Sequence, residues 1–401
     1  MSFDLIIIGA GMAGLPCAIR SADKKKKVLL VNKNKEIGGK LPRSTGQIAA
    51  AGTNIQKRKK IQDSPELHLR ESWKICNSTA DLKLLRLAID NAADTVNWLE
   101  EIGVKFPEDH PVITYQHDIY STRRYQWPIG YGKEILECMS TLINEHIISN
   151  NITLLNETIL IDFIKDNNNE INGVTLLNNQ NKKINYYSNN IVLTAGGYTN
   201  NEKLFNKFSP KVTLYTPKFS GSRGLVHELA QSYNIKIDGG HLYKGMIGGV
   251  LKKNDDKNSV SIALNTIPQD RQPWEIWVNC EGKRFMREDH PSADYRRHKV
   301  NKQPKQKFYI IFDEGVFINA PPISMTSDGG LQSHIKQELV FKKYQSIEEL
   351  ANGINVKFDN LFKTLKKYNT SVANKEDLFG REHLPREIEG PTYYSIESVA
   401  F

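Results

Sequence analysis

The feature that most constrains this chain is a glycine-rich hexapeptide, Gly9-Ala10-Gly11-Met12-Ala13-Gly14, near its start. A short β-branched run, Asp4–Ile8, precedes it, and helix-compatible residues follow it through about Ser21. A second apolar run, Val28–Val31, comes next. Short apolar runs on both sides of a helix are typical of buried parallel strands. We therefore predict a compact β-α-β unit at the start of the chain.

The three glycines of the hexapeptide predict what this unit binds. Gly9 permits a tight turn after the first strand, Gly11 lets the backbone approach a pyrophosphate, and Gly14 lets helix and strand pack closely. The intervening Met12 and Ala13 lie where the helix begins, and a helix N-terminus attracts phosphate. The motif in this strand-turn-helix-strand context predicts a dinucleotide cofactor.

The end of the second strand departs from the usual pattern of such units. An acidic residue commonly stands there and accepts hydrogen bonds from the ribose hydroxyls, whereas this chain has Asn32, followed by Lys33. An asparagine can still bond a hydroxyl, but without the strength that a charged acceptor adds. We take both residues as cofactor-binding candidates and expect a weaker affinity.

Composition places the chain among globular proteins. Its 401 residues are 39% hydrophobic and 25% charged, which suits two or three domains. No apolar run approaches the roughly 20 residues of a membrane span, and the N-terminus lacks a secretory signal, so we expect a cytoplasmic protein. The four cysteines are far apart and form no C-x-x-C pair, so we expect reduced structural thiols and no metal site.

The formal net charge of +9 would attract an anionic cofactor, an acidic substrate or a nucleic acid. Much of it lies in short runs, Lys24–Lys27 and Lys57–Lys60, which are typical of a solvated surface. No zinc-finger, RRM or helix-turn-helix pattern accompanies these runs. A nucleic-acid-associated protein remains an alternative that rests on charge alone, and we predict no nucleic-acid partner.

Small residues dominate two segments after the second strand, Glu36–Lys40 and Ser44–Thr53. Together they resemble the second FAD-contacting stretch of the fumarate reductase and succinate dehydrogenase flavoproteins. The resemblance continues in the same order to the end of the chain. It is carried by Gln56, Asp63–Glu66, Thr95–Val104, Val192–Tyr198, Asn279–Phe285, Asp377–Arg381 and Gly390–Tyr394.

The resemblance implies FAD as the cofactor. It also implies an α/β fold: a Rossmann-like FAD-binding domain with a parallel sheet and a small antiparallel meander, plus an inserted α+β cap domain that holds substrate against the flavin. We expect domains at residues 1–239 and 240–390, with residues 391–401 starting the return into the FAD domain. The cofactor-binding residues implied are Gly9, Gly11, Met12, Ala13, Gly14, Asn32, Lys33, Gly38, Gly39, Ser44, Thr45, Gly46, Ala195, Gly196 and Gly197.

The middle of the chain predicts the meander independently of the resemblance. Its apolar runs are separated by Asn-rich turns and lie at Ile152–Leu155, Ile159–Ile164, Ile171–Leu177 and Ile184–Tyr187. Helical periodicity predicts helices from about Lys133 to Ile148 and from Val356 to Tyr368.

Flavin enzymes that interconvert a C-C and an activated C=C bond move a hydride through the flavin and a proton through a side chain. The resemblance implies that an arginine or tyrosine shortly after the Asn279–Phe285 segment supplies this proton, so the candidates are Tyr295, Arg296 and Arg297. Arginine also grips a carboxylate bidentately. The substrate-binding candidates are His241, Lys244, Arg287 and His290, and Arg123 and Arg124 are pocket candidates for which a surface position is an equal alternative.

The function implied is an FAD-dependent oxidoreductase, fumarate-reductase-like or ketosteroid-dehydrogenase-like, that acts on CH-CH bonds. Its expected substrate is a small organic acid or cyclic ketone, and its electron partner stays unidentified. Fumarate reductases carry a His-Pro pair early in the cap, which is absent around His241. The family also continues beyond the point where this chain stops. The alternative is therefore a catalytically silent flavin-binding or assembly subunit that needs a second chain to complete the FAD domain.

Overall fold

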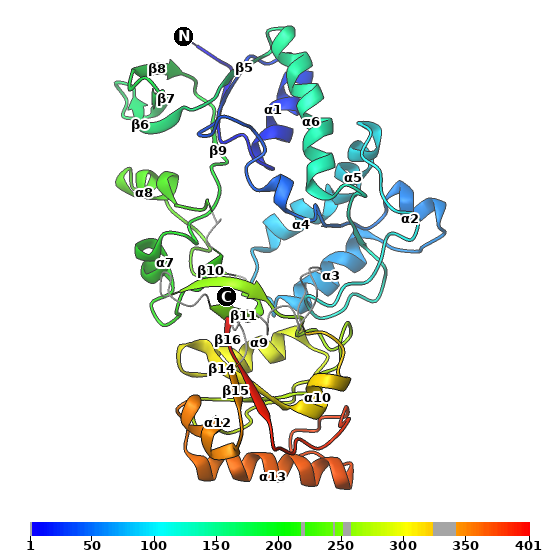
Figure 1. The fold of residues 1–401 in the computed structure, drawn as a ribbon. Helices are drawn as coiled ribbons and strands as arrows, with labels where there is room; N and C mark the ends of the chain where they lie inside the picture. The colour runs from blue at the N-terminus through cyan, green and yellow to red at the C-terminus, as the bar shows by residue number, and fades with distance from the viewer. Residues whose placement is uncertain (1, 218–220, 244, 252–257, 324–341) are drawn as a thin grey trace. The chain divides into compact units, whose positions relative to one another are not determined.

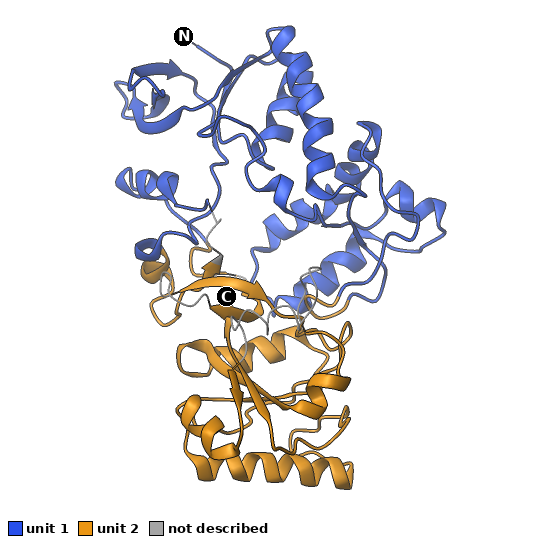
Figure 2. Ribbon diagram, viewed as in Figure 1, with its two compact units in different colours: residues 1–114, 120–204, 221–238 blue, residues 115–119, 205–220, 239–401 orange. Residues whose placement is uncertain are grey.

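A computed structural model describes residues 2–217, 221–243, 245–251, 258–323 and 342–401 (Figure 1). The chain divides into two compact units (Figure 2). Unit 1 comprises residues 1–114, 120–204 and 221–238, and unit 2 comprises residues 115–119, 205–220 and 239–401. Each unit has its own sheets and its own buried apolar cluster, so each is described by itself.

Unit 1 is built on a four-stranded parallel sheet with the order β5-β2-β1-β9. Its strands are β1 (Leu5–Ile8), β2 (Val28–Val31), β5 (Ile152–Leu155) and β9 (Ile191–Leu193). Helix α1 (Gly14–Asp23) connects the first two, so the predicted β-α-β unit is confirmed. The assignment of Ile152–Leu155 to the meander was wrong, because this segment pairs in parallel with Val28–Val31 as an edge of the main sheet.

The two faces of this sheet pack on different layers because successive strand side chains point to opposite sides. Ile7 of β1 packs against α1 and against α6 (Tyr131–Ile148). Its neighbours Ile6 and Ile8 pack on the other face against the meander. This meander is a three-stranded antiparallel sheet of β6 (Ile159–Lys165), β7 (Ile171–Leu177) and β8 (Lys183–Tyr187), as predicted.

A mainly helical part of unit 1 follows the second glycine-rich segment. It contains η1 (Leu41–Arg43), an antiparallel pair of short strands, β3 (Ile48–Ala49) and β4 (Tyr125–Gln126), and the helices α2 (Asn54–Arg58), α3 (Pro65–Ile75), α4 (Leu82–Asp90) and α5 (Ala92–Glu101). Helix α7 (Glu202–Phe208) spans the boundary between units, and α8 (Leu225–Ser232) closes unit 1.

Arg124 holds this helical part together from the inside. Its guanidinium is fully buried and is paired with Asp63 at 2.7 Å and with Glu71. Burial alone would raise the pKa of Asp63, but the bonds from Arg124 and Gln56 outweigh it and lower this pKa. Arg124 is thus buried and ion-paired within unit 1, so the surface alternative for it is wrong.

Unit 2 contains a mostly antiparallel sheet with the order β10-β12-β11-β16-β14-β13, to which β15 adds by pairing with β16. The strands are β10 (Thr216–Pro217), β11 (Ile247–Leu251), β12 (Ser259–Ala263), β13 (Ile276–Val278), β14 (Lys307–Asp313), β15 (Lys342–Tyr344) and β16 (Tyr393–Ala400). Residues 391–401, expected to start a return into the FAD domain, contain β16, which pairs with β11 and β14 inside unit 2.

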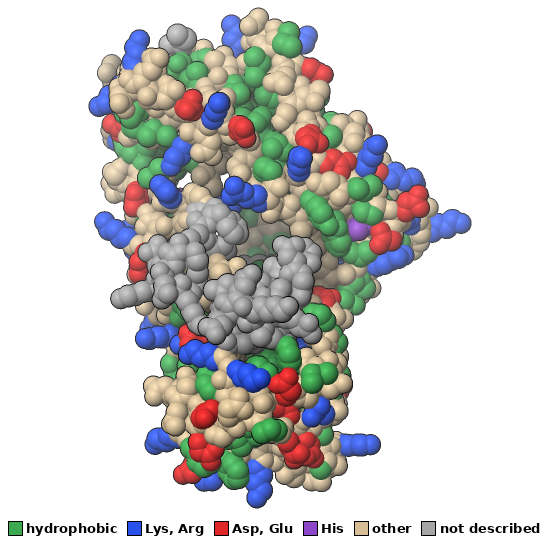
Figure 3. All heavy atoms as spheres, viewed as in Figure 1, with side chains coloured by type: hydrophobic (Ala, Val, Ile, Leu, Met, Phe, Trp, Pro, Cys, Tyr) green, Lys and Arg blue, Asp and Glu red, His purple; other side chains and the backbone are tan. Residues whose placement is uncertain are grey.

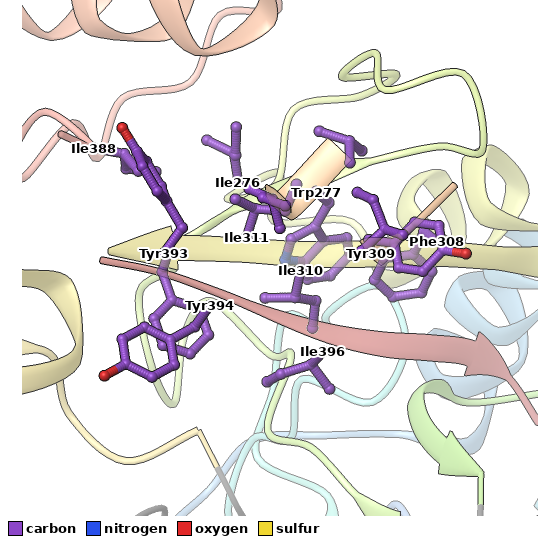
Figure 4. Packing of buried hydrophobic residues seen from close by; sticks show 14 of the residues in the cluster. Ile276, Trp277, Phe308, Tyr309, Ile310, Ile311, Ile388, Tyr393, Tyr394 and Ile396 are labelled. Carbon is purple, nitrogen blue, oxygen red and sulfur yellow. The ribbon is translucent and has the colours of Figure 1, made fainter. Parts of the chain in front are cut away.

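The core of unit 2 forms where this sheet meets its helices (Figure 4). Trp277 of β13, Phe308 of β14 and Ile396 of β16 are buried in it. The helices are α9 (Ala293–Asn301), α10 (Glu314–Asn319), α12 (Ile347–Gly353) and α13 (Phe358–Asn374), with the short η2 (Pro304–Gln306) between α9 and β14. The helix predicted from Val356 to Tyr368 corresponds to α13.

The basic runs lie on the surface. Lys24–Lys27 and Lys57–Lys60 are exposed, as expected. Lys and Arg side chains are dispersed over the face drawn in Figure 3, with acidic side chains between them. Among the described residues, no helix combines the length and the apolar character needed to cross a bilayer.

Candidate functional site

The first turn of unit 1 brings Gly9 and Gly14 against the backbone so closely that neither position accepts a side chain. A β-carbon at Gly14 would lie 1.8 Å from the carbonyl oxygen of Gly9. Gly9 has a φ of +119°, and a β-carbon there would lie 2.5 Å from the carbonyl oxygen of Thr194. Thr194 Oγ1 donates to that same Gly9 carbonyl at 2.8 Å. These two glycines therefore serve the close packing of β1, α1 and β9.

Gly11 differs from both of these glycines. A β-carbon built on it meets no atom within 4 Å of the described chain. Met12 and Ala13 beside it are exposed. In the described residues, the N-terminus of α1 has no side-chain cap and no acidic residue in its first turn. The positive end of the helix is thus left for an anion, as a pyrophosphate requires.

The second glycine-rich segment lies against this turn. Gly38 N donates to Ala10 O at 2.7 Å, and a β-carbon on Gly39 would lie 3.4 Å from Gly11 Cα. Farther along, Ser44 O accepts from Gly132 N at 3.0 Å, so the Ser44–Gly46 stretch rests on the start of α6. Gly46 has a φ of +65°, which L side chains rarely adopt, and a β-carbon on it would lie 2.8 Å from Ile135 Cδ1. Thr45 between Ser44 and Gly46 is exposed.

The third segment follows β9. Thr194 N donates to Ile8 O at 2.8 Å, so Ala195, Gly196 and Gly197 begin beside the end of β1. All three are exposed, and a β-carbon on Gly196 meets no described atom within 4 Å. Three loops at the carboxyl ends of parallel strands thus meet at one place. Ligands of open α/β sheets bind at such carboxyl ends.

Asn32 has a structural task in this site. It is 5% exposed, and its Nδ2 donates to Asn34 O, Glu36 O and Asn156 Oδ1, each at 2.9 Å. The amide nitrogen therefore ties the end of β2 to the end of β5 and is not available to a ribose. Lys33, the other candidate at this strand end, is exposed.

The proton-donor candidates lie in unit 2, on α9. Ser292 caps this helix by accepting from Tyr295 N at 3.1 Å. Arg296 is 2% exposed, and its Nε has no hydrogen-bond partner in the described part of the chain. One of its Nη atoms donates to the carbonyl of Thr266. Burial, and then the neighbouring charge of Arg297, lower the pKa of Arg296 to about 10.

A buried guanidinium of this kind is unusual, because buried charges are normally paired with an opposite charge. Within the described residues, Arg296 has a carbonyl partner and an unpartnered Nε in place of a carboxylate. It can bind an anion, and its lowered pKa makes it a better proton donor than an exposed arginine.

The neighbouring candidates have partners of their own. The rings of His290 and Tyr295 stack with centroids 3.9 Å apart. Burial, and then the charges of Arg287 and Arg296, lower the pKa of His290, so its imidazole is neutral near pH 7. Arg287 pairs with two carboxylates, Asp289 and Glu382, both at 2.8 Å.

Arg297 has partners that differ from those of Arg296. Its Nη1 lies 3.2 Å from Asp294 Oδ1, and its Nη2 donates to the carbonyl of Gln116 at 2.5 Å. The substrate-binding candidate His241 is exposed near a turn at Gly239. Lys244 lies outside the described residues.

A buried ion network fixes the segment that leads into α9. Arg284 pairs with Glu288 at 2.6 Å and with Asp377 at 2.5 Å, and Arg271 pairs with Glu275 at 2.9 Å. Arg381 joins both halves, because it lies 3.5 Å from Glu288 and donates to the Glu275 carbonyl at 2.8 Å. The resembling segments Asn279–Phe285 and Asp377–Arg381 therefore meet in the structure.

Sequence reasoning left three residues of these sites without a role. Gly52 has a φ of +86°, and its β-carbon would meet no described atom within 4 Å, as is also true of Gly11 and Gly196. Thr194 locks the third segment to the first turn. Asp118 has a buried Oδ1 that lacks a hydrogen-bond partner in the described residues, and its charge acts on Arg296 and His290. Gly52 lies in the predicted small-residue segment and Thr194 in the resembling segment Val192–Tyr198, whereas no sequence pattern pointed to Asp118.

No metal centre is found within the part of the chain that the structure describes, since no three His, Cys, Asp or Glu side chains gather to hold an ion. The four cysteines are free thiols, and Cys280 is exposed.

Comparison with known proteins connects the glycine-lined site with a cofactor. A family model described as FAD binding domain matches residues 4–397. A fumarate reductase (cytochrome) of Shewanella frigidimarina is 26% identical over 98% of this chain and 65% of its own length. An NADH:fumarate oxidoreductase of Klebsiella pneumoniae is 27% identical over 95% of this chain and 38% of its own length. The chain thus spans less than two thirds of these relatives.

A solved structure shares the fold. A 3-ketosteroid Δ1-dehydrogenase from Sterolibacterium denitrificans, crystallised with 1,4-androstadiene-3,17-dione, superposes with a TM-score of 0.74. It is 15% identical in sequence, and the match covers 99% of this chain and 87% of that chain. The expected fold class is therefore confirmed.

Proposed function

This chain belongs to the family described as FAD binding domain, and from that premise we propose that it is a flavin-dependent oxidoreductase acting on a carbon-carbon double bond next to a carboxylate or carbonyl group. FAD is the cofactor, and when bound it supplies or accepts a hydride. Gly11, Gly39 and Gly196 would lie along its pyrophosphate side, where the backbone is open and the α1 N-terminus meets a negative charge.

The observation that carries the proposal is the buried Arg296. Reduction of an activated C=C bond leaves a carbanion that needs a proton, and a carbonyl or carboxylate that gathers negative charge. A guanidinium with a lowered pKa and no carboxylate partner among the described residues suits both needs. We assign the proton transfer to Arg296 and a supporting role to the stacked His290 and Tyr295.

The substrate class proposed is a small unsaturated organic acid, with a cyclic ketone as the second choice. Two relatives are named for fumarate, which supports the acid. Exposed His241 and the neutral His290 are candidates for holding the second end of such a molecule, whereas Arg287 is already paired. We propose residues 1–239 for the cofactor and residues 240–390 for the substrate.

The test uses FAD-loaded protein with a reduced viologen dye as electron donor and a panel of unsaturated acids and cyclic enones. Wild type should oxidise the dye with at least one acceptor. Arg296→Met should lose about 10²-fold or more in kcat, the range of a general acid, with FAD content unchanged. Arg296→Lys should retain part of the activity. If no acceptor is reduced, or if Arg296→Met turns over normally, the proposal fails.

A second candidate function has its own observation. The apolar strand β9 pairs with β1 on one side, and no other described strand pairs with its second edge. Val192 is 36% exposed and Leu193 is 37% exposed, although parallel strands are normally covered on both faces. This supports a flavin-binding subunit that a second chain completes at β9. Such a subunit would bind FAD but would turn over only when its partner is present. After incubation with an extract of its host, the chain should elute from a gel-filtration column at a smaller volume than the chain alone.

A further inference from the structure

A lysine side chain connects two of the three loops that meet at the carboxyl ends of the parallel strands of unit 1. Lys40 Nζ donates a hydrogen bond to Ser222 Oγ at 2.7 Å. Lys40 directly follows Gly39, on which a β-carbon would lie 3.4 Å from Gly11 Cα. The backbone of Lys40 is therefore beside the first glycine-rich turn, and its side chain reaches a serine 182 residues later in the chain.

The serine end of this bond is fixed beside the third segment, which follows β9. Ser222 is 6% exposed, and its Oγ lies 3.8 Å from the place that a β-carbon on Gly197 would take. Its backbone carbonyl accepts from Asn200 N at 2.7 Å. Just after it, Gly224 N donates to Gly197 O at 3.2 Å, so this stretch is fastened to the third segment. The Lys40 ammonium is thus held beside Gly197.

The position of this ammonium suits a pyrophosphate. A β-carbon on Gly11 or on Gly196 would meet no described atom within 4 Å, so the backbone of the first and third loops is open to a ligand at these two places. Lys40 reaches from beside one of these openings to beside the other. An ammonium has three N–H donors, so it can donate to a hydroxyl and to a phosphate oxygen at the same time.

The end of β2 gives a reason for a positive charge at the phosphates. Dinucleotide-binding units commonly have an acid there, which binds the ribose. Asn32 has no charge, and its amide nitrogen donates to the protein. A charge-assisted bond from Lys40 to the phosphates would offset this loss at another point along the same cofactor.

We propose that Lys40 binds the pyrophosphate of FAD, and that Ser222 is a positioning residue, which holds the Lys40 ammonium beside the third segment. The inference rests on the proposed function only in taking FAD as the cofactor. It does not depend on the substrate or on Arg296.

The first arm of the test titrates the FAD-free chain with FAD and follows the flavin fluorescence, so it does not depend on turnover. Lys40→Met keeps the length of the side chain but removes its charge, and it should weaken FAD binding by about tenfold or more, the effect of losing a hydrogen bond to a charged group. Because Lys40 is exposed, the urea midpoint of the FAD-free variant should equal that of wild type.

The matched control is Lys26→Met. It removes the same charge from unit 1, but at the amino end of β2, whereas Lys40 follows the carboxyl end of that strand. Lys26→Met should change the FAD affinity by less than about twofold, because salt screens a distant surface charge. A wild-type affinity in Lys40→Met would overturn the proposal. If wild type itself binds no FAD, the proposed function fails.

The second arm repeats these titrations at about 0.05 M and about 0.5 M salt, because screening weakens the attraction between an ammonium and a phosphate. The ratio of the wild-type affinity to the Lys40→Met affinity should be smaller at the higher salt concentration. A ratio that does not change with salt would show that Lys40 acts by something other than its charge and would overturn the proposal.

Ser222→Ala tests the positioning role. It should weaken FAD binding by about threefold when Lys40 is present, the effect of one hydrogen bond, but by less than about 1.5-fold in the Lys40→Met background, because the serine acts through the lysine. Equal losses in both backgrounds would show that Ser222 acts separately from Lys40 and would overturn its assignment as a positioning residue.

Discussion

Replacing Asn32 by aspartate tests whether the fold forbids an acid at the end of β2, where dinucleotide-binding units commonly have one. The change keeps the shape of the side chain but exchanges an NH₂ donor for an acceptor. In the wild type this nitrogen donates to three oxygens, those of Asn34, Glu36 and Asn156, at 2.9 Å each. The new carboxylate would face all three with no hydrogen to offer.

The magnitude follows from these contacts. Two N–H donors are lost, and each acceptor left unsatisfied costs about 1–3 kcal/mol. Since Asn32 is 5% exposed, water replaces little of this. We expect Asn32→Asp to lose about 3 kcal/mol of unfolding free energy at pH 7, in addition to any change in FAD affinity.

The loss of unfolding free energy in Asn32→Asp should grow as the pH rises. Because it faces three oxygens, the carboxyl introduced by Asn32→Asp would have a folded pKa above its unfolded value of about 3.9. Below about pH 4 this carboxyl is protonated in both states and can donate one hydrogen bond, so the loss is smallest there. As the pH rises from about 4 through the folded pKa, the destabilisation grows to its full value.

Urea denaturation at pH 4 and pH 7 measures both effects. Asn34→Asp is the matched control, since Asn34 is exposed and enters this network only through its backbone carbonyl. The reasoning is refuted if Asn32→Asp unfolds within about 0.5 kcal/mol of Asn34→Asp at pH 7, the range of an ordinary surface substitution.

Three further predictions concern other residues of unit 1. Gly14→Ala should cost about 3 kcal/mol in urea denaturation, because its β-carbon would meet the Gly9 carbonyl at 1.8 Å. The new methyl group of Gly11→Ala would lie in open space, so the free energy of unfolding should change by less than about 1 kcal/mol. The affinity for FAD should nevertheless fall by about tenfold or more in a fluorescence titration. An unchanged affinity would contradict the proposed position of the cofactor. Arg124→Met should cost about 3–5 kcal/mol by leaving buried acids unpaired, and equal stability would contradict the account. Because the pKa of Asp63 is lowered in the folded state, the Asp63 carboxylate stabilises the fold above about pH 4, and this stabilisation is lost as the pH falls through the folded pKa. Arg124→Met should abolish this pH dependence of the unfolding free energy in urea titrations.

The elements predicted best from sequence are those whose information is local. The hexapeptide and its flanking runs specify β1, α1 and β2, because the turn, the helix start and both strands lie within a few residues of one another. The meander is similar, since each of its strands pairs with the next one along the chain.

Predictions failed where pairing is distant. Ile152–Leu155 is a short apolar run like those of the meander, and its partner Val28–Val31 is more than 100 residues earlier. Nothing in a four-residue apolar run distinguishes a parallel partner from an antiparallel one. The long-range contacts of Arg124 with Asp63 and Glu71 were hidden for the same reason.

The candidate site was predictable in residue type but not in the role of each residue. The sequence alone does not distinguish the adjacent Arg296 and Arg297. In the folded chain Arg296 is buried, whereas Arg297 donates to the Gln116 carbonyl. Similarly, the amide nitrogen of Asn32 could donate to a ribose or to the protein, and only the folded positions of Asn34, Glu36 and Asn156 show that it donates to the protein. These choices depend on the distances that folding creates.

The measurement that tests the central claim most directly is an anaerobic absorption series on the FAD-loaded chain. Dithionite should bleach the flavin band at about 450 nm, and an unsaturated acid from the panel should restore it in wild type within a single turnover. Arg296→Met should bleach in the same way but recover about 10²-fold more slowly. Failure to bind FAD, or recovery of Arg296→Met at the wild-type rate, would contradict the account.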